Sequence, residues 1–149
     1  MGFSEAVRCC LQQKYATFQG RASRSEYWWF FLFYLLGAMV LFVLLFAFGG
    51  MQSLENGDFS GLPTVPLILI ALYFLGMILP MTSATVRRFH DRNLSGWWYL
   101  ASILAGFIPI VGFVASIAAL VITILKGTPG PNKFGRDPLG PDTNADVFA

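Results

Sequence analysis

The chain has 149 residues, of which 56% are apolar and only 12% charged, with a formal net charge of +2. Soluble globular domains carry about 25% charged residues, so this composition argues against one. Charged side chains are absent from three stretches, residues 27–54, 59–86 and 93–125. Each stretch exceeds the ~20 residues that cross a bilayer as a helix. The sequence therefore predicts an all-α, polytopic helical membrane protein with three to four apolar helical segments.

Residues 1–20 form an N-terminal arm. Its apolar positions recur at helical spacing, at Phe3, Val7, Cys10, Leu11 and Tyr15. This spacing predicts a short amphipathic helix lying on a membrane surface. An ordinary helix packed on the rest of the protein is the alternative.

Residues 21–126 form the predicted helical membrane domain, with its first two spans at about 24–48 and 66–86. Ser23 and Glu26 form an S-x-x-E capping box, which predicts that the first helix begins at Arg24. The stretch between the two spans is rich in Gly, Pro, Ser and Asn and is expected to be a loop.

The third apolar segment, residues 97–125, is longer than one span needs and shorter than two full spans need. Either one kinked helix crosses the bilayer once, or a re-entrant pair of shorter helices turns back near Pro109. Residues 127–149 form a Pro/Gly-rich tail that cannot bury a core of its own.

Basic residues predict the orientation, because short loops rich in Lys and Arg stay in the cytoplasm. The arm carries Arg8, Lys14, Arg21 and Arg24, whereas the loop after the first span has no Lys or Arg. A multi-pass protein with a cytoplasmic N-terminus is expected. Four tryptophans would then anchor the inner membrane interface, namely Trp28, Trp29, Trp97 and Trp98.

The candidate site is a cluster of charged residues on this predicted cytoplasmic face. It comprises Arg21, Arg24, Arg87, Arg88, His90, Asp91 and Arg92. One interpretation is a solvated collar that only fixes topology; the other is a site for an anionic lipid headgroup or a membrane partner. Glu26 could meet Arg87 or Arg88 across helices, but its capping role already explains it.

Other functions have less support in the sequence. A single histidine cannot build the usual multi-histidine metal site, and no cysteine cluster has metal-ligand spacing. No catalytic residue, metal, cofactor or nucleic-acid partner is predicted. The favoured hypothesis is a non-enzymatic interaction or regulatory module in contact with the lipid bilayer, with a membrane-protein partner or a homo-oligomer as further options. A subunit of a transport system and a membrane-interface enzyme are the alternatives.

Three stretches carry a family resemblance: FQGRASRSEYWWF (18–30), VRRFHDRNLSGWWYL (86–100) and KGTPGPNKFGRDP (126–138). Together they resemble domain-of-unknown-function family 805, the YhaH/YhaI-like small bacterial inner-membrane proteins. In the third stretch the family pattern falls on Gly127, Asn132, Phe134, Gly135, Asp137 and Pro138. Members often carry a basic residue where Leu94 stands, which weakens any anion site that relied on that group. The resemblance implies the bacterial inner (plasma) membrane and implies no activity.

Overall fold

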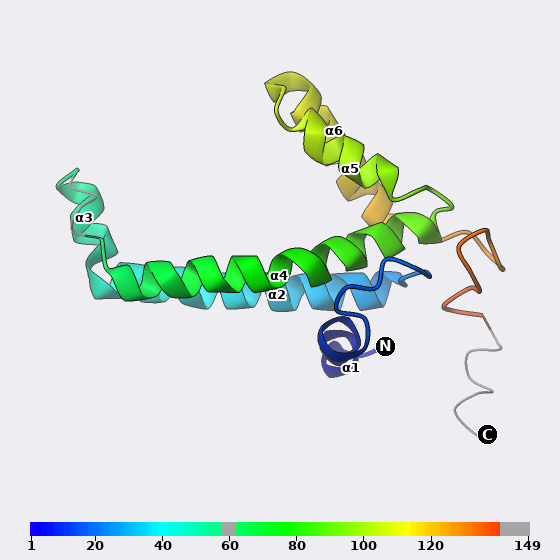
Figure 1. The fold of residues 1–149 in the computed structure, drawn as a ribbon, viewed down its shortest axis with the longest axis horizontal. Coiled ribbons are helices and arrows are strands. Elements are labelled where there is room, and N and C mark those ends of the chain that lie inside the picture. Colours follow the sequence, from blue (N-terminus) through cyan, green and yellow to red (C-terminus); the bar gives the residue numbers. More distant parts are fainter. Residues whose placement is uncertain (58–61, 141–149) are drawn as a thin grey trace. The chain divides into compact units, whose positions relative to one another are not determined.

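A computed structural model describes residues 1–57 and 62–140, and the regular structure in these two ranges is helical (Figure 1). This confirms the all-α prediction. In chain order the elements are α1 (Phe3–Arg8), the π-helix η1 (Cys9–Gln13), α2 (Arg24–Leu45), the π-helix η2 (Phe46–Gly50), α3 (Met51–Glu55), α4 (Thr64–Asp91), α5 (Trp97–Ala105) and α6 (Pro109–Ile124). The helical run Arg24–Glu55 and α4 are long and apolar enough to cross a membrane, and α6 is a shorter apolar helix.

The chain divides into two compact units. The long-helix unit is Phe31–Leu79, and the motif unit is made of the described residues of Met1–Phe30 and Pro80–Ala149. The three sequence stretches that carry the family resemblance all lie in the motif unit.

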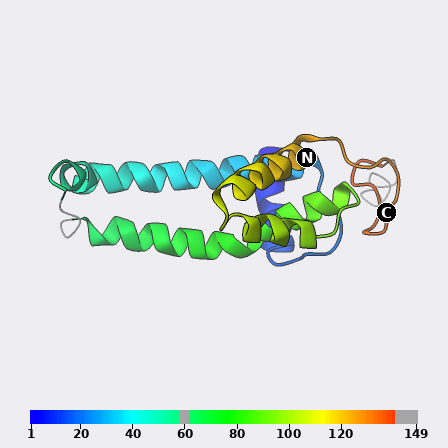
Figure 2. The ribbon, with the colours of Figure 1, turned by 90° about the horizontal axis from the view of Figure 1, so that it is seen from above.

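In the long-helix unit, the parts of α2 and α4 that belong to it run side by side (Figure 2). The Tyr73 hydroxyl donates a hydrogen bond to the Tyr34 carbonyl at 2.8 Å, and the two rings stack with centroids 6.0 Å apart. Gly37 allows this approach, because a Cβ added there would lie 2.5 Å from the Tyr73 hydroxyl oxygen. Close packing at a glycine is typical of membrane helix pairs.

The structure shows how each of the two long helices ends. After α2 ends at Leu45, Gly49 adopts a φ of +104° inside η2, and α3 then occupies part of the expected loop. The positive φ of Gly49 interrupts the helical run directly after residue 48, because regular helix requires a negative φ. α4 extends beyond the predicted 66–86 at both ends, and its last turn carries the charged residues up to Asp91.

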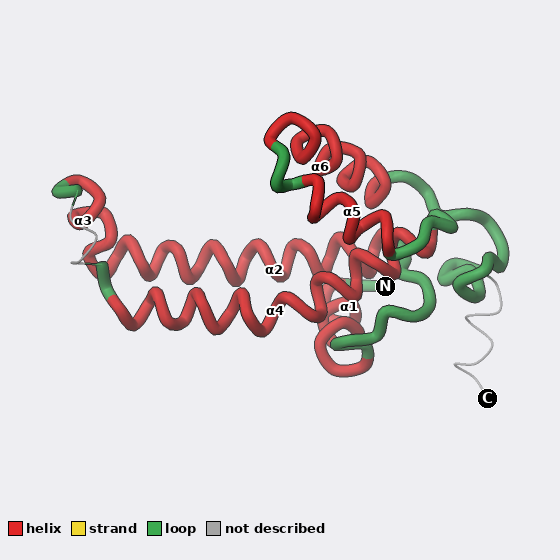
Figure 3. The backbone as a smooth tube through the Cα atoms, turned by 45° about the horizontal axis from the view of Figure 1, so that its top comes forward, coloured by secondary structure: helices red, strands yellow, loops and turns green. Residues whose placement is uncertain are grey.

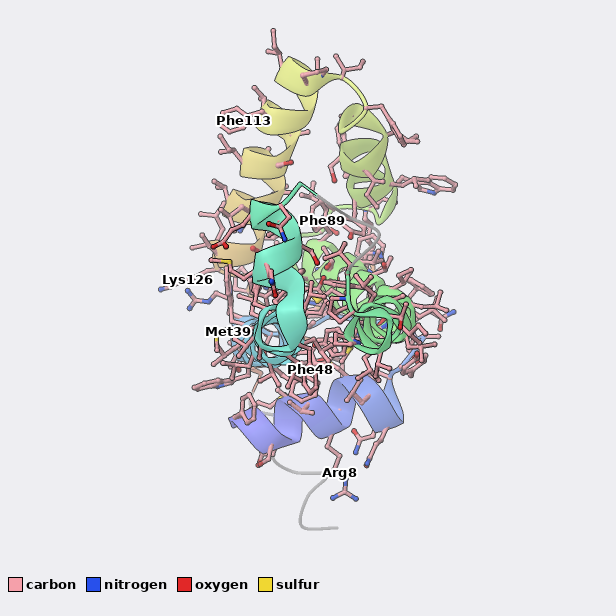
Figure 4. The ribbon with its side chains drawn as sticks, turned by 90° about the vertical axis from the view of Figure 1, so that its left-hand side faces the viewer. Arg8, Met39, Phe48, Phe89, Phe113 and Lys126 are labelled. Atoms are coloured by element: carbon pink, nitrogen blue, oxygen red, sulfur yellow. The ribbon has the colours of Figure 1, made fainter. Side chains whose placement is uncertain are left out.

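The N-terminal helix packs on the motif unit through a face of small residues. Ala6, Cys9 and Cys10 are buried, whereas Phe3 stays exposed and meets the Trp29 ring edge-on at 5.9 Å. Arg8 points away from the protein on the opposite side (Figure 4).

Residues 97–125 form two helices, α5 and α6, which pack against each other as a hairpin (Figure 3). The turn between them is tight. A Cβ added to Gly112 would lie 2.7 Å from the Gly106 Cα, so the helices approach closely where α6 begins. Of the two forms that the sequence left open for this segment, the structure has the helix pair.

A buried charged cluster and its exposed rim

The last turns of α4 carry two arginines that are shielded from solvent. Arg87 and Arg88 each have 0% of their surface exposed, and Asp91 has 3%. Glu26, in the first turn of α2, and Arg21, which precedes that helix, are buried beside them. These five side chains are called the arginine cluster below. A buried charge needs a partner of opposite sign and full hydrogen bonding, and the cluster supplies nearly all of both.

Arg87 pairs with Glu26 through a contact between Nη1 and Oε1. The thiols of the N-terminal helix surround this pair: Cys9 Sγ lies 3.6 Å from Glu26 Oε1, and Arg87 Nη2 lies 3.7 Å from Cys10 Sγ. Burial, then the Glu26 charge, raises the pKa of Cys10 to about 11. Both thiols are thus neutral and shielded. Within the described residues, one buried side-chain nitrogen lacks a hydrogen-bond partner, Nε of Arg87.

Glu26 therefore has a different role from the one that the capping box suggested. The Glu26 backbone N–H donates to Ser23 Oγ at 3.2 Å, so Ser23 caps the start of α2. The Glu26 carboxylate instead forms the ion pair with Arg87, with Lys14 Nζ at 3.9 Å. The expectation that capping explains Glu26 is corrected, because the charge of Arg87 is buried against it.

Asp91 lies between the other two arginines. Arg21 Nε donates to Asp91 Oδ1 at 2.8 Å, and Arg88 Nη1 pairs with Asp91 Oδ2. The remaining donors of both guanidinium groups reach backbone carbonyls. Arg21 donates to Thr128 and Gly130, each at 2.6 Å, and Arg88 donates to Ala22, Thr123 and Leu125. Both arginines thus hold the chain segments around them rather than reaching outward.

The tail docks on this end of α4. The Thr128 backbone N–H donates to the Asp91 carbonyl at 2.8 Å, and Asn132 Nδ2 donates to the His90 carbonyl at 2.9 Å. Phe134 stacks flat on the His90 imidazole, with ring centroids 3.8 Å apart and planes 3° apart. The imidazole Nδ1 lies 3.1 Å from the Gly20 carbonyl oxygen. The described part of the tail thus packs against the end of α4.

Local geometry explains why glycine and aspartate occupy two positions of the tail, 127 and 137. A Cβ added to Gly127 would lie 2.1 Å from Asp91 Oδ2, so only glycine fits there. The Asp137 carboxylate accepts hydrogen bonds from the backbone N–H groups of Leu139 and Gly130, each at 3.0 Å. These two bonds and the Arg21 charge lower the pKa of Asp137.

The predicted site residues thus separate into two groups. Arg21, Arg87, Arg88, His90 and Asp91 are buried within the protein, whereas Arg24 and Arg92 keep exposed surface. Lys126, which was not among the predicted site residues, is exposed as well. Arg92 Nη1 donates to the Lys126 carbonyl at 2.5 Å. The buried group is neither a solvated collar nor a surface for a headgroup, so any contact with an external anion falls to the exposed group.

A pocket of ≈ 360 Å³ opens beside Arg24 and Lys126. Its lining also includes Asp91 and Asp137 and two short pieces of the tail, residues 127–129 and 138–139. Lys126 lies at the outer edge of the ribbon where α6 gives way to the tail (Figure 4). Reasoning from sequence missed Lys126 and Thr128 as site residues, although their place in the third family stretch could have indicated them.

The four predicted anchor tryptophans differ in exposure. Trp97 and Trp98 are 75% and 63% exposed, as residues at a membrane interface would be in the absence of lipid. Trp28 is partly covered, and its indole Nε1 donates to the Thr123 carbonyl at 3.3 Å. Among residues 1–57 and 62–140, no group of three or more His, Cys, Asp or Glu side chains could hold a metal ion.

A comparison with protein-family models identifies the family of the chain. The model of a family described as protein of unknown function (DUF805) matches residues 15–136. The chain belongs to the DUF805 family. This match contains the first two stretches and residues 126–136 of the third.

Two of the similar proteins are named as inner membrane proteins. The inner membrane proteins YhaH and YhaI of Escherichia coli are each 34% identical over 126 residues, covering 85% of this chain and 90% and 89% of theirs. The uncharacterized protein YiiR of Escherichia coli is 26% identical over 145 residues, covering 85% of this chain and 89% of its own. No solved structure matches. The chain is therefore a member of an inner-membrane family of unknown function, and none of these relatives is named for an enzymatic activity.

Proposed function

We propose that the protein is a non-enzymatic module of the inner membrane that binds an anionic phospholipid headgroup in the pocket between Arg24 and Lys126. The observation that carries the proposal is the division of the cations: the arginine cluster is satisfied internally, while Arg24 and Lys126 line an open pocket. The N-terminus and the arginine cluster lie on the cytoplasmic side in this proposal, because the basic residues flank the apolar helices there.

The charges around the pocket favour an anion. Asp91 is already paired with both Arg21 and Arg88, so two positive charges face one negative charge before the pocket is reached. Arg24 and Lys126 add two more cations, against one further carboxylate, Asp137. The net charge of these side chains is therefore positive. A planar guanidinium and an ammonium that line the same pocket suit the oxygens of a phosphate group.

The test is lipid binding by native mass spectrometry of the purified protein. Phosphatidylglycerol is compared with phosphatidylcholine, so that the headgroup charge is the variable. Each of Arg24→Gln and Lys126→Gln is expected to weaken phosphatidylglycerol binding roughly fivefold, since a Lys or Arg near an anionic surface is worth about 1 kcal/mol. Binding of phosphatidylcholine should not change.

Arg8→Gln is the matched control, because Arg8 is an exposed arginine that points away from the protein and lies outside the pocket. An equal loss in Arg8→Gln would mean nonspecific charge attraction and would contradict the proposal. Inorganic phosphate that displaces the lipid at low concentration would show a soluble anion as the ligand instead. No preference for phosphatidylglycerol in the wild-type protein would also overturn it.

A further inference from the structure

The helical hairpin formed by α5 and α6 exposes a continuous apolar surface that the arginine cluster does not use. We propose that this hairpin is a re-entrant element: it enters the cytoplasmic leaflet of the bilayer, turns within the acyl chains and returns to the side from which it came. Its partner is lipid hydrocarbon. The proposal does not depend on the headgroup pocket, because it rests on the hairpin alone.

Both ends of the hairpin are fixed at the same place. At the start, α4 passes into α5 through a tight turn in which the Leu94 N–H donates to the Phe89 carbonyl at 3.0 Å. At the end of α6, Arg88 Nε donates to the Thr123 carbonyl at 3.0 Å, and Arg88 also bonds the Leu125 carbonyl. Because residues on both sides of the hairpin bind the last turns of α4, entry and exit lie on one side of any boundary that the hairpin penetrates.

The helices are too short for two crossings. α5 has 9 residues and α6 has 16, which correspond to about 14 Å and 24 Å at ~1.5 Å per residue. The hydrocarbon core is ≈ 30 Å thick, so α5 reaches about half of it. The shorter helix, α5, limits how deep the turn can lie, so the turn stays within one leaflet.

The tip is chemically suited to hydrocarbon. Phe107 and Ile110 are 83% and 80% exposed, and Phe113 projects from α6 (Figure 4). Backbone donors in the turn are satisfied locally: the N–H groups of Phe107 and Ile108 bond the carbonyls of Leu104 and Ala105 at 3.2 and 2.9 Å. Pro109, the first residue of α6, has no N–H to satisfy. Non-helical backbone at membrane depth requires such satisfaction.

The space between the two helices is also apolar. A groove of ≈ 460 Å³ is lined by alanines of both helices, including Ala101, Ala105, Ala115 and Ala119. Its one hydroxyl, on Ser102, already donates to the Tyr99 carbonyl at 2.7 Å. Water entering the groove would find few hydrogen-bond partners, whereas an acyl chain loses nothing there. If the hairpin were in water, the apolar surface of the groove and of the tip would be exposed to solvent, which is unfavourable.

Depth measurements with nitroxide labels test the proposal in liposomes of the full chain. Phe107→Cys and Leu139→Cys are labelled separately in a background where Cys9 and Cys10 are replaced by serine, and unchanged circular dichroism and unfolding temperature confirm the fold. The label at 107 is expected to be several-fold more accessible to oxygen than to a water-soluble nickel chelate, and the label at 139 the reverse. A membrane-impermeant reductant should reach position 139 from the same side as a label at Gln12→Cys.

Three results would overturn the proposal. Equal nickel accessibility at 107 and 139 would place the tip in water. A label at 139 reached only from the side opposite to 12 would mean a complete crossing. A label at 107 shielded from both reagents would mean that the tip packs on protein. None of these results depends on Arg24 or Lys126, so the headgroup proposal stands or fails separately.

Discussion

At the scale of single residues, the controlling fact is that Arg87 is charged and has no exposed surface. Removing one partner of a buried ion pair leaves the other charge uncompensated, which costs more than the pair itself contributes. The clustering of Arg87, Arg88 and Asp91 next to the second span was visible in the sequence, but their place in the last turns of α4 was not. The Arg87–Glu26 pair could not be predicted from the sequence, because its burial depends on a tertiary contact in which the N-terminal helix covers the pair.

Glu26→Gln should therefore destabilise the protein strongly. We expect a loss of about 3–5 kcal/mol in the free energy of unfolding, because Arg87 then keeps a buried charge with no carboxylate. The double variant Glu26→Gln/Arg87→Gln should lose less than the sum of the two single changes. Denaturant unfolding in mild detergent measures all three; strict additivity would contradict the ion pair.

The two cysteines should be unreactive in the folded protein. Cys10 is fully buried with a pKa raised to about 11, and burial raises the pKa of Cys9 as well, so almost no thiolate is present at neutral pH. Mass spectrometry after maleimide treatment at pH 7 should show no adduct before unfolding and two adducts after it. Rapid labelling of the native protein would show that the N-terminal helix does not cover the pair.

At the scale of elements, the long apolar helices were predictable because charge-free stretches report directly on membrane helices. The residues at which these helices end were not predictable from the sequence. α4 continues to Asp91 because its polar last turn is paired with Arg21 and Glu26, which no periodicity reveals. Residues 97–125 stayed ambiguous because a proline and two glycines permit both a kink and a turn. The Gly106–Gly112 approach decides for a turn.

Packing of α2 on α4 within the long-helix unit should depend on Gly37. Gly37→Ala places a Cβ against the Tyr73 ring, and we expect overpacking to cost about 1–3 kcal/mol. Gly76→Ala is the matched control: it lies in the same unit, a Cβ there meets no atom within 4 Å, and helix propensity makes it neutral or slightly stabilising. Thermal unfolding in detergent compares them, and equal midpoints would disprove the Gly37 contact.

The tail should detach when Asn132 is lost. Asn132→Ala removes hydrogen bonds to the His90 carbonyl and the Thr128 hydroxyl, and it leaves the Phe134 N–H without its acceptor. We expect trypsin to cut after Lys133 and Arg136 several-fold faster than in the wild-type protein, consistent with about 1–3 kcal/mol of lost docking. Leu139→Ala, at an exposed side chain in the same tail, should not change the rate. Unchanged cleavage in Asn132→Ala would mean that the tail does not dock through this residue.

At the scale of the whole molecule, three stretches separated by long apolar segments converge on one cluster in the motif unit. The family resemblance marked these stretches, but nothing in their sequences showed that they touch. The structure shows the contact, because the Arg21 guanidinium donates hydrogen bonds to Asp91 and to the tail carbonyls of Thr128 and Gly130. The convergence requires the N-terminal arm, the end of α4 and the tail to share one side of the membrane.

The most direct test of this convergence is the side on which each terminus lies. Paired reporters, one active only in the cytoplasm and one only in the periplasm, are fused before Met1 and after Ala149 in separate chains. The account predicts cytoplasmic activity at both ends, with Glu26→Gln as a variant that lowers the amount of protein but not its orientation. A periplasmic C-terminus would separate the tail from Arg21 and Asp91 by a bilayer, and it would contradict the cluster as the centre of the fold.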